Sequence, residues 1–266
     1  NKELFYGTDY LSHLGTKRGG LATVDKDGFH RTIHSLENAY FRSKFEPDID
    51  KLPGTMGVGV ISDTDSQPIM VHSHLGKFAV VTIGKIVNLE ELTQKAFDEN
   101  IHFAETSQGG INPTELVSIL INQKDSFVEG ILNAQTNIKG SCSMLVLTES
   151  GIYVARDRLG RTPIIIGKRD DAFAASSESS AFSNLGFETQ YYVGPNEIVF
   201  MTQEGIQQVQ PPGDEMQVCS FLWVYYGYPA SSYEGINTEQ VRYNCGAALA
   251  KRETEKADLV AGIPDS

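Results

Sequence analysis

Residues 77–83, Lys-Phe-Ala-Val-Val-Thr-Ile, and residues 142–148, Cys-Ser-Met-Leu-Val-Leu-Thr, are the stretches that decide the fold. Both are apolar, have the length of a strand and are bounded by Gly or Ser, a pattern typical of β-strands. Similar runs occupy 57–62, 68–72, 151–156 and 163–167. Strands therefore dominate the first two thirds of the chain.

Three helical stretches lie between these strands. Asn88 and Glu91 form a capping-box pattern that predicts a helix to about Asp98. Thr114 is expected to cap a second helix, and a third is predicted at 126–137. Groups of strands that alternate with groups of helices indicate sheets packed face to face with helices outside, in an α+β arrangement, rather than a regular parallel βαβ series.

The composition restricts the class of function. The 266 residues carry a net charge of −12, which disfavours nucleic acid and anionic membranes as partners because both require a surplus of Lys and Arg. No apolar stretch approaches the roughly 20 residues that span a bilayer, and no signal-peptide pattern is present. Three dispersed cysteines indicate reduced thiols. We expect a soluble, cytoplasmic protein that binds small molecules or other proteins.

A change in composition divides the chain. Residues 210–216 have the Pro, Gly and charge content of a linker, which separates a first domain at 1–209 from a second at 217–266. The second domain begins with aromatic residues, continues with a helix capped by Asn237, and ends with an apolar strand expected at 258–263. Helix and buried strand after such a break predict the opening of an α/β domain.

The last residues, Pro264-Asp265-Ser266, form a turn directly after that expected strand. In parallel sheets such a turn leads into a helix or a ligand loop, and chemistry is usually found there. We therefore expect the chain to be a fragment that stops near the start of its second domain. Asp265 and Ser266 are its candidate site residues.

Four segments in matching order make the sequence resemble the glutamine phosphoribosylpyrophosphate amidotransferases. They are Val154-Ala-Arg-Asp-Arg-Leu-Gly-Arg-Thr-Pro-Ile-Ile-Ile-Gly-Lys, Ala175-Ser-Ser-Glu-Ser-Ser-Ala-Phe, Cys219-Ser-Phe-Leu-Trp-Val-Tyr-Tyr-Gly-Tyr-Pro and Ala257-Asp-Leu-Val-Ala-Gly-Ile-Pro-Asp-Ser. The resemblance implies a four-layer αββα N-terminal-nucleophile fold of class II glutamine amidotransferases for 1–209. It implies the start of an α/β phosphoribosyltransferase domain for the rest, with Asp265 and Ser266 as nucleotide-binding residues.

The glutaminase of that family uses an N-terminal Cys, whose thiol is the nucleophile and whose α-amine is the base. Asn1 cannot take this role, so either the true N-terminus lies upstream or the nucleophile is absent. The short segment Leu4-Phe5-Tyr6-Gly7 suggests that an initial strand is missing too. The H-R-G-Q turn of the family corresponds here to Leu14-Gly15-Thr16-Lys17.

The remaining glutamine-site positions are also altered in the register that the resemblance gives. The carboxylate-binding Arg falls on Val60, the oxyanion-hole Asn on Ile83 and the amine-binding Asp on Pro113, and Gly84 is retained. Because each change removes a charge or a hydrogen-bonding amide, we predict that the domain does not hydrolyse glutamine. The alternative is a register shifted by one residue. A different, more apolar ligand in the altered pocket is a further hypothesis.

The second domain of the family transfers ammonia to phosphoribosylpyrophosphate with Mg²⁺, and the acidic phosphoribose loop is not found in this sequence. Some members bind a four-iron cluster through a Cys that corresponds to Cys219, with three further ligands downstream. Two functions therefore remain open for the parent protein, which we expect to be a homo-oligomer. The first is that of an amidophosphoribosyltransferase-like enzyme of purine biosynthesis. The second is that of a non-catalytic binding or regulatory module.

Structural roles are predicted for the other conspicuous residues. Cys142 is expected in a core, and Cys245 in helix packing. His72 and His74 lack the partners of a metal site, and no metal is assigned. Lys17-Arg18-Gly19-Gly20 is too short for a phosphate loop. Arg156, Asp157 and Arg161 are expected to brace a turn beside the sheet.

Overall fold

The computed structural model describes residues 1–107, 109–170 and 172–262. The chain forms two compact units, Asn1–Cys219 and Ser220–Ser266. This division falls three residues after the start of the second domain expected from the sequence. The reason is Gln217, whose backbone N–H donates to the Leu159 carbonyl oxygen at 2.8 Å and whose Oε1 accepts from Arg161 Nε at 3.1 Å. Gln217 therefore belongs to the first unit.

A six-stranded antiparallel sheet forms one of the central layers of the first unit, with strand order β14-β13-β9-β8-β5-β4. Its strands are β4 (Ile69–Ser73), β5 (Gly76–Ile86), β8 (Gly140–Thr148), β9 (Ile152–Ala155), β13 (Ile198–Thr202) and β14 (Gly205–Gln210). The two stretches quoted first in the sequence, 77–83 and 142–148, form the neighbouring strands β5 and β8, with Phe78 opposite Thr148.

The facing layer consists of two three-stranded antiparallel sheets, ordered β2-β1-β3 and β11-β10-β12. Their strands are β1 (Arg18–Asp25), β2 (Gly28–Ser35), β3 (Met56–Ser62), β10 (Ile165–Arg169), β11 (Ala172–Ser176) and β12 (Glu188–Tyr192). A short pair, β6 (Thr106–Ser107) and β7 (Gly110–Ile111), precedes the second large helix. The sequence did not predict β1 and β2, and residues 4–7 lie in a helix.

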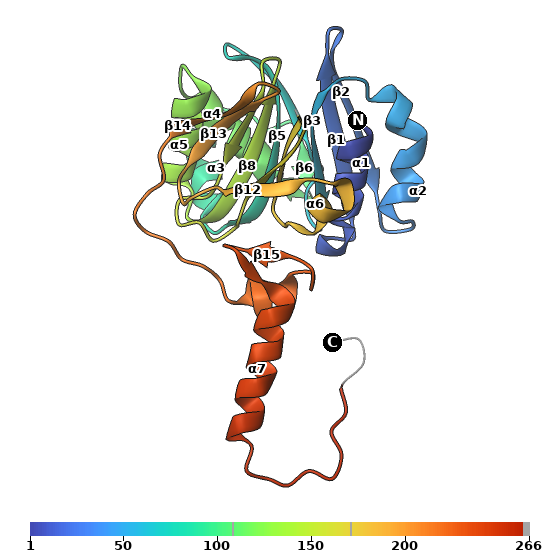
Figure 1. The fold of residues 1–266 in the computed structure, drawn as a ribbon. Helices are drawn as coiled ribbons and strands as arrows, with labels where there is room; N and C mark the ends of the chain where they lie inside the picture. Colours follow the sequence, from blue (N-terminus) through green and yellow to red (C-terminus); the bar gives the residue numbers. More distant parts are fainter. Residues whose placement is uncertain (108, 171, 263–266) are drawn as a thin grey trace. The chain divides into compact units, whose positions relative to one another are not determined.

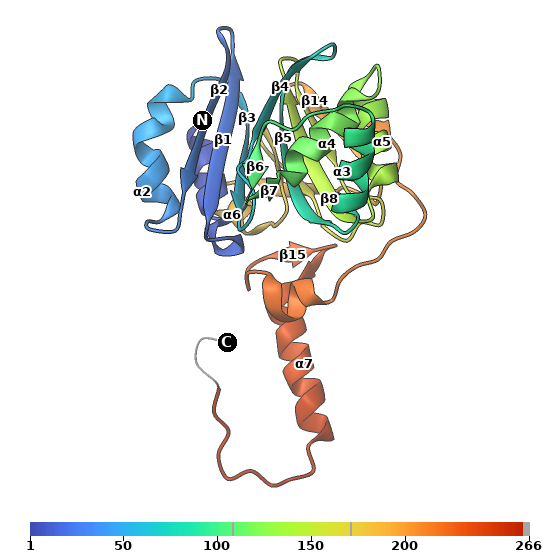
Figure 2. The same ribbon diagram turned by 180° about the vertical axis from the view of Figure 1, so that it is seen from behind.

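Helices cover the outer face of each layer (Figures 1 and 2). On the six-stranded sheet these are α3 (Leu89–Asp98), α4 (Pro113–Asn122) and α5 (Phe127–Asn137). On the other side they are α1 (Lys2–Asp9), η1 (Ser12–Leu14), α2 (Phe41–Phe45), η2 (Glu46–Lys51) and α6 (Ser180–Leu185). The unit is thus an αββα sandwich.

Both faces of β5 are buried, which explains its continuous apolar sequence. Phe78 and Val80 pack against the helices α3, α4 and α5, while Ala79 and Val81 face the other sheet layer. Phe41 and Phe45 stack at 4.2 Å between ring centroids and fill the space under α2. Separate apolar cores therefore lie between all the layers, and the predicted four-layer fold is confirmed.

The helix starts differ in detail from those predicted. Asn112, and not Thr114, caps α4, because Asn112 Oδ1 accepts the Thr114 backbone N–H at 2.9 Å. Asn88 precedes α3 as expected, but its side chain caps nothing: its Oδ1 accepts the Lys139 N–H at 2.8 Å and its Nδ2 donates to the Asn137 carbonyl oxygen at 3.0 Å. Asn88 therefore joins α3 to the end of α5.

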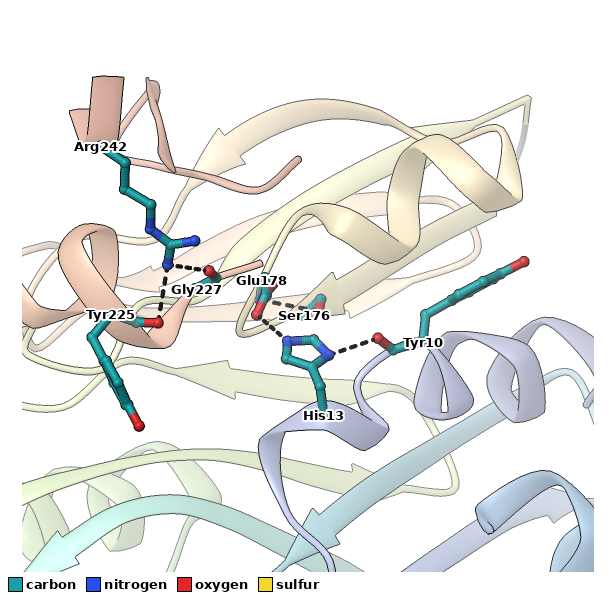
Figure 3. Close-up of polar contacts among 7 residues, drawn as sticks. All are labelled: Tyr10, His13, Ser176, Glu178, Tyr225, Gly227 and Arg242. Atoms are coloured by element: carbon teal, nitrogen blue, oxygen red, sulfur yellow. Dashed lines mark hydrogen bonds and ion pairs between the residues drawn. The ribbon is translucent and has the colours of Figure 1, made fainter. Parts of the chain in front are cut away.

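The second unit is small and contains the π-helix η3 (Leu222–Tyr226), the strand pair β15 (Ser232–Tyr233) and β16 (Ile236–Asn237), and α7 (Thr238–Arg252). Asn237 caps α7 as predicted, through the Gln240 N–H at 3.0 Å. Arg242 of α7 donates to the carbonyl oxygens of Trp223, Tyr225 and Gly227, the last two drawn in Figure 3. It therefore holds the end of η3 against α7.

The expectation of a strand at 258–263 is wrong for residues 258–262, the part of this range that the structure describes. Residues 258–262 have no strand partner, and Leu259 and Val260 are 85% and 87% exposed. An apolar run forms a strand only where another strand supplies hydrogen bonds, and here none of the described residues does so. A search of the described helices found none with the length and apolar character required to cross a membrane.

Candidate functional site

Val60 lies on β3 directly opposite Gly20 of β1. Its half-buried side chain packs against the apolar core between the two sheet layers. Gly20 is in close contact with the next segment, because a Cβ atom at this position would lie 1.7 Å from the Gln67 carbonyl oxygen. Gly20 is therefore a contact residue inside a strand, and Lys17-Arg18-Gly19-Gly20 is no phosphate loop.

Gln67 joins this contact to β5. Its side chain is buried, its Oε1 accepts the Thr82 backbone N–H at 2.7 Å and its Nε2 donates to the Thr82 carbonyl oxygen at 3.3 Å. The amide therefore pairs with the Thr82 backbone as a neighbouring strand would. This interaction fixes β5 immediately before the two positions of interest, Ile83 and Gly84.

Asn112 and Thr114 hold Pro113 beside the same part of β5. The Thr114 and Thr82 hydroxyl oxygens lie 2.6 Å apart, and Asn112 Nδ2 donates to the Ser66 carbonyl oxygen at 2.9 Å. Pro113 is the first residue of α4, a position that needs no backbone N–H. The structure thus connects the sequence-predicted positions Val60, Ile83, Gly84 and Pro113 through Gly20, Gln67, Thr82 and Thr114.

Gly84 has a structural requirement of its own. Its φ of +134° favours glycine, and a Cβ atom there would lie 2.2 Å from the Ser141 carbonyl oxygen of β8. Ile83 is half-buried and pairs with Ser143. Retention of Gly84 is therefore explained by the approach of β8, whether or not the position has a role in chemistry.

None of Val60, Ile83 and Pro113 can carry charge, and two charged side chains of nearby segments, Glu115 and Arg31, make other contacts. The two carboxylate oxygens of Glu115 accept the backbone N–H groups of Ala104 and Glu105 at 2.8 and 2.9 Å. Arg31 Nη1 donates to the Pro68 carbonyl oxygen at 3.1 Å and lies 3.6 Å from Glu105 Oε1. The predicted positions therefore supply no bidentate clamp for a carboxylate.

Asp157 organises a turn next to β8, as the sequence predicted. Its Oδ1 accepts the N–H groups of Leu159 and Arg161 at 3.2 and 3.1 Å, and its Oδ2 accepts that of Thr162 at 2.7 Å. The buried Arg156 donates to the Val193 carbonyl oxygen at 2.6 Å and to the Gly160 carbonyl oxygen at 2.5 Å. These bonds confirm that Arg156, Asp157 and Arg161 brace the turn.

His13 and Glu178 form a contact that the sequence did not suggest (Figure 3). His13 Nε2 lies 3.0 Å from Glu178 Oε2, although 165 residues separate them, and His13 Nδ1 lies 3.2 Å from the Tyr10 carbonyl oxygen. The Glu178 backbone N–H donates to Ser176 Oγ at 3.2 Å. The contact joins η1 to the turn after β11.

The cysteines and histidines singled out in the sequence show no catalytic environment. Cys142 is buried, and this burial, aided by the charge of Asp157, raises the pKa of its thiol to about 12, so the thiol stays protonated. Cys219 is exposed, and Cys245 lies in α7 but is exposed too, so its predicted packing is not observed. His72 and His74 are also exposed.

Metal-binding side chains do not gather in the part of the chain that the structure describes. Over 1–107, 109–170 and 172–262, no three His, Cys, Asp or Glu side chains are placed to hold a metal ion together. A lone exposed thiol such as Cys219 does not fit a four-iron cluster, which requires four ligands. The nucleotide-site candidates Asp265 and Ser266 lie outside the described residues.

Comparison with known proteins gives the same relationship by sequence and by structure. The family profile described as a glutamine amidotransferase domain matches residues 56–184. Amidophosphoribosyltransferase from Bacillus subtilis is 28% identical over 98% of this chain and 56% of its own length. The solved glutamine phosphoribosylpyrophosphate amidotransferase from B. subtilis, complexed with ADP and GMP, has a TM-score of 0.90 at 26% identity. The match includes 100% of this chain and 58% of the B. subtilis chain.

This chain is similar to the amidophosphoribosyltransferases both in sequence and in fold. The mouse member is 26% identical over 96% of this chain and 56% of the mouse protein. The chain thus spans little more than half the length of these curated relatives. Within the amidophosphoribosyltransferase fold, the connected positions Val60, Ile83, Gly84 and Pro113 lie in the part of the chain that the amidotransferase profile matches, 56–184.

Proposed function

We propose that this chain is part of an amidophosphoribosyltransferase-like protein of purine biosynthesis whose glutaminase-like domain has lost glutamine hydrolysis. In this proposal the parent protein makes phosphoribosylamine from phosphoribosylpyrophosphate and ammonia, and the first domain has a structural role. The observation that carries the proposal is the connected group of Val60, Ile83 and Pro113, which together offer neither a charge nor a side-chain hydrogen-bond donor.

The magnitude of the loss can be estimated from what each group contributes. Removal of one oxyanion-hole donor typically lowers the rate about 100- to 1,000-fold. Loss of a bidentate charged clamp lowers binding of the substrate carboxylate as well. The contacts of Gln67 with Thr82 further support the proposal, because the Thr82 N–H is already bonded to a protein group. Val60 packs in the core between sheets, where an Arg would need a partner.

Release of glutamate from glutamine by the full-length protein tests the proposal, with the B. subtilis relative as the reference. We expect turnover no faster than that of heat-denatured protein, and no heat of binding for glutamine by calorimetry. Turnover within about tenfold of the reference would contradict the proposal, since it exceeds what the missing donor allows. Glutamine binding without turnover would show that another set of residues holds the amino acid.

Further parts of the proposal concern the parent protein. If it is an ammonia-dependent transferase, Mg²⁺ would accompany phosphoribosylpyrophosphate, and Asp265 and Ser266 would belong to its nucleotide site. Cys219 would become a cluster ligand only with three further cysteines. We also propose that the protein is cytoplasmic and forms a homo-oligomer. A parent protein that forms no phosphoribosylamine from ammonia and phosphoribosylpyrophosphate would favour the alternative, a non-catalytic binding or regulatory module.

A further inference from the structure

Gln135 is a buried amide of α5 that makes one hydrogen bond with a fixed direction. Its Nε2 donates to the Arg156 carbonyl oxygen at 2.5 Å, and the residue is 3% exposed. Because a carbonyl oxygen only accepts, the NH₂ group of the amide must face Arg156. Gln135 Oε1 therefore points the other way, and it is bonded to none of the protein groups that the structure describes.

Gln135 is also one of the residues that line a small hollow. Gln135, Ile138, Gly140, Cys142, Asp157 and Arg158 line it, and its cavity volume is about 10 Å³. It is located where the end of α5 meets β8 and the turn that Asp157 organises. A cavity needs roughly 10 to 15 Å³ of such volume to hold a water molecule, so this hollow has room for a single water molecule and nothing larger.

The groups around the hollow select a neutral ligand that donates hydrogen bonds. Cys142 remains a neutral thiol because burial raises its pKa to about 12. Asp157 is negatively charged, but three backbone N–H groups already bond to its two oxygens. The unsatisfied group is an acceptor, Gln135 Oε1, and a buried acceptor without a donor is costly. The ligand need not be charged, because the lining contains both the Asp157 carboxylate and Arg158.

We propose that this hollow is a binding site for an ordered water molecule that donates a hydrogen bond to Gln135 Oε1. Its second O–H can reach an acceptor of the same lining, such as the Asp157 carboxylate. The water then extends a chain of hydrogen bonds that runs from the Arg156 carbonyl oxygen through the Gln135 side-chain amide to the turn after β9. In this way it fixes α5 to the turn that braces β8.

A crystal structure of the 266-residue chain, at a resolution that shows ordered water, tests the site. We expect electron density for a water oxygen within about 3.2 Å of Gln135 Oε1. The density should be lost in Gln135→Met, which has a similar unbranched length but no amide, and kept in Gln123→Met, which changes an exposed glutamine near the end of α4. A protein donor bonded to Gln135 Oε1, or an empty hollow, would overturn the proposal.

A measurement on the unaltered protein in solution does not depend on how the variant folds. A long-lived water gives a cross-relaxation peak between the water resonance and the Gln135 side-chain amide protons in NMR spectra, whereas exposed amides such as that of Gln123 exchange with transient water. We expect this peak for Gln135. Its absence, with the amide protons visible and slowly exchanging, would show that no resident water occupies the hollow.

Discussion

Asp48 shows how a single carboxylate can link stability to pH. Lys51 Nζ and His34 Nε2 lie 2.7 and 2.6 Å from its oxygens, and Thr32 Oγ1 donates at 2.9 Å. The contacts with Lys51 and then His34 lower the pKa of Asp48 to about 2. Since this value lies below the ordinary one of about 4, the contribution is present above pH ~4 and is lost as the pH falls towards 2.

The corresponding substitution is Asp48→Asn. We expect it to lower the free energy of unfolding at pH 7 by about 1 to 2 kcal/mol, and the difference from the unaltered protein to shrink below pH ~4 and disappear below pH 2. Urea unfolding at several pH values measures both. Asp50→Asn, on the same η2 segment but exposed, is the control and should leave the pH profile unchanged. A constant difference at every pH would contradict the pKa assignment.

Gly20 is required because two backbones approach each other there. A Cβ atom would lie 1.7 Å from the Gln67 carbonyl oxygen, which belongs to the backbone and cannot rotate away as a side chain could. We expect Gly20→Ala to lower the free energy of unfolding by about 1 to 3 kcal/mol or more through overpacking. Gly7→Ala in α1, whose nearest contact is Leu185 Cδ1 at 3.5 Å, should be neutral or stabilising. Thermal unfolding of both variants would separate these outcomes.

At the scale of elements, Gln67 anchors β5 near its end. Replacement by Met removes both hydrogen bonds to the Thr82 backbone and leaves a buried N–H without its acceptor. We expect Gln67→Met to cost about 1 to 3 kcal/mol, and to make exchange of the Thr82 amide hydrogen faster relative to the Val80 amide. Gln94→Met, which loses only an exposed contact with Asp98, is the control. Unchanged protection of Thr82 would show that this contact does not hold the strand.

The elements that the sequence predicted best are those with strong local patterns. Strands β5 and β8 are apolar on both faces, and Ser126 and Asn237 cap their helices through the N–H groups three residues on. β1 and β2 were missed, because glycines and histidines give them a weak apolar pattern. Their strand state depends on pairing with each other and with β3, which no local pattern reveals.

The candidate site was predictable as a set of positions but not as a network. The resemblance placed Val60, Ile83 and Pro113 by alignment alone. The structure adds Gln67, which links β1 to β5. The approach of His13 to Glu178 joins residues 165 positions apart, and nothing in either local sequence indicates it. Contacts of this kind follow from the packing of the layers.

For the whole molecule, the two units differ in how much apolar surface each buries. The buried apolar clusters that the structure defines all lie within residues 1–219, whereas α7 has a single buried residue among those described, Thr238. Since burial of apolar surface is the main driving force of folding, the first unit contains what it needs to fold. The second unit has only a small cluster around Trp223 and Tyr233.

We therefore expect residues 1–219 to fold alone into the αββα sandwich with cooperative urea unfolding. A cut at residue 197 is the control, because it removes β13 and β14 and exposes the edge of β9, which β13 pairs in the intact sheet. This shorter chain should aggregate or unfold without cooperativity. Circular dichroism and hydrogen exchange of the β5 and β8 amides distinguish the two outcomes. If residues 1–219 behaved like the shorter chain, the boundary at Cys219 would not delimit an independent folding unit.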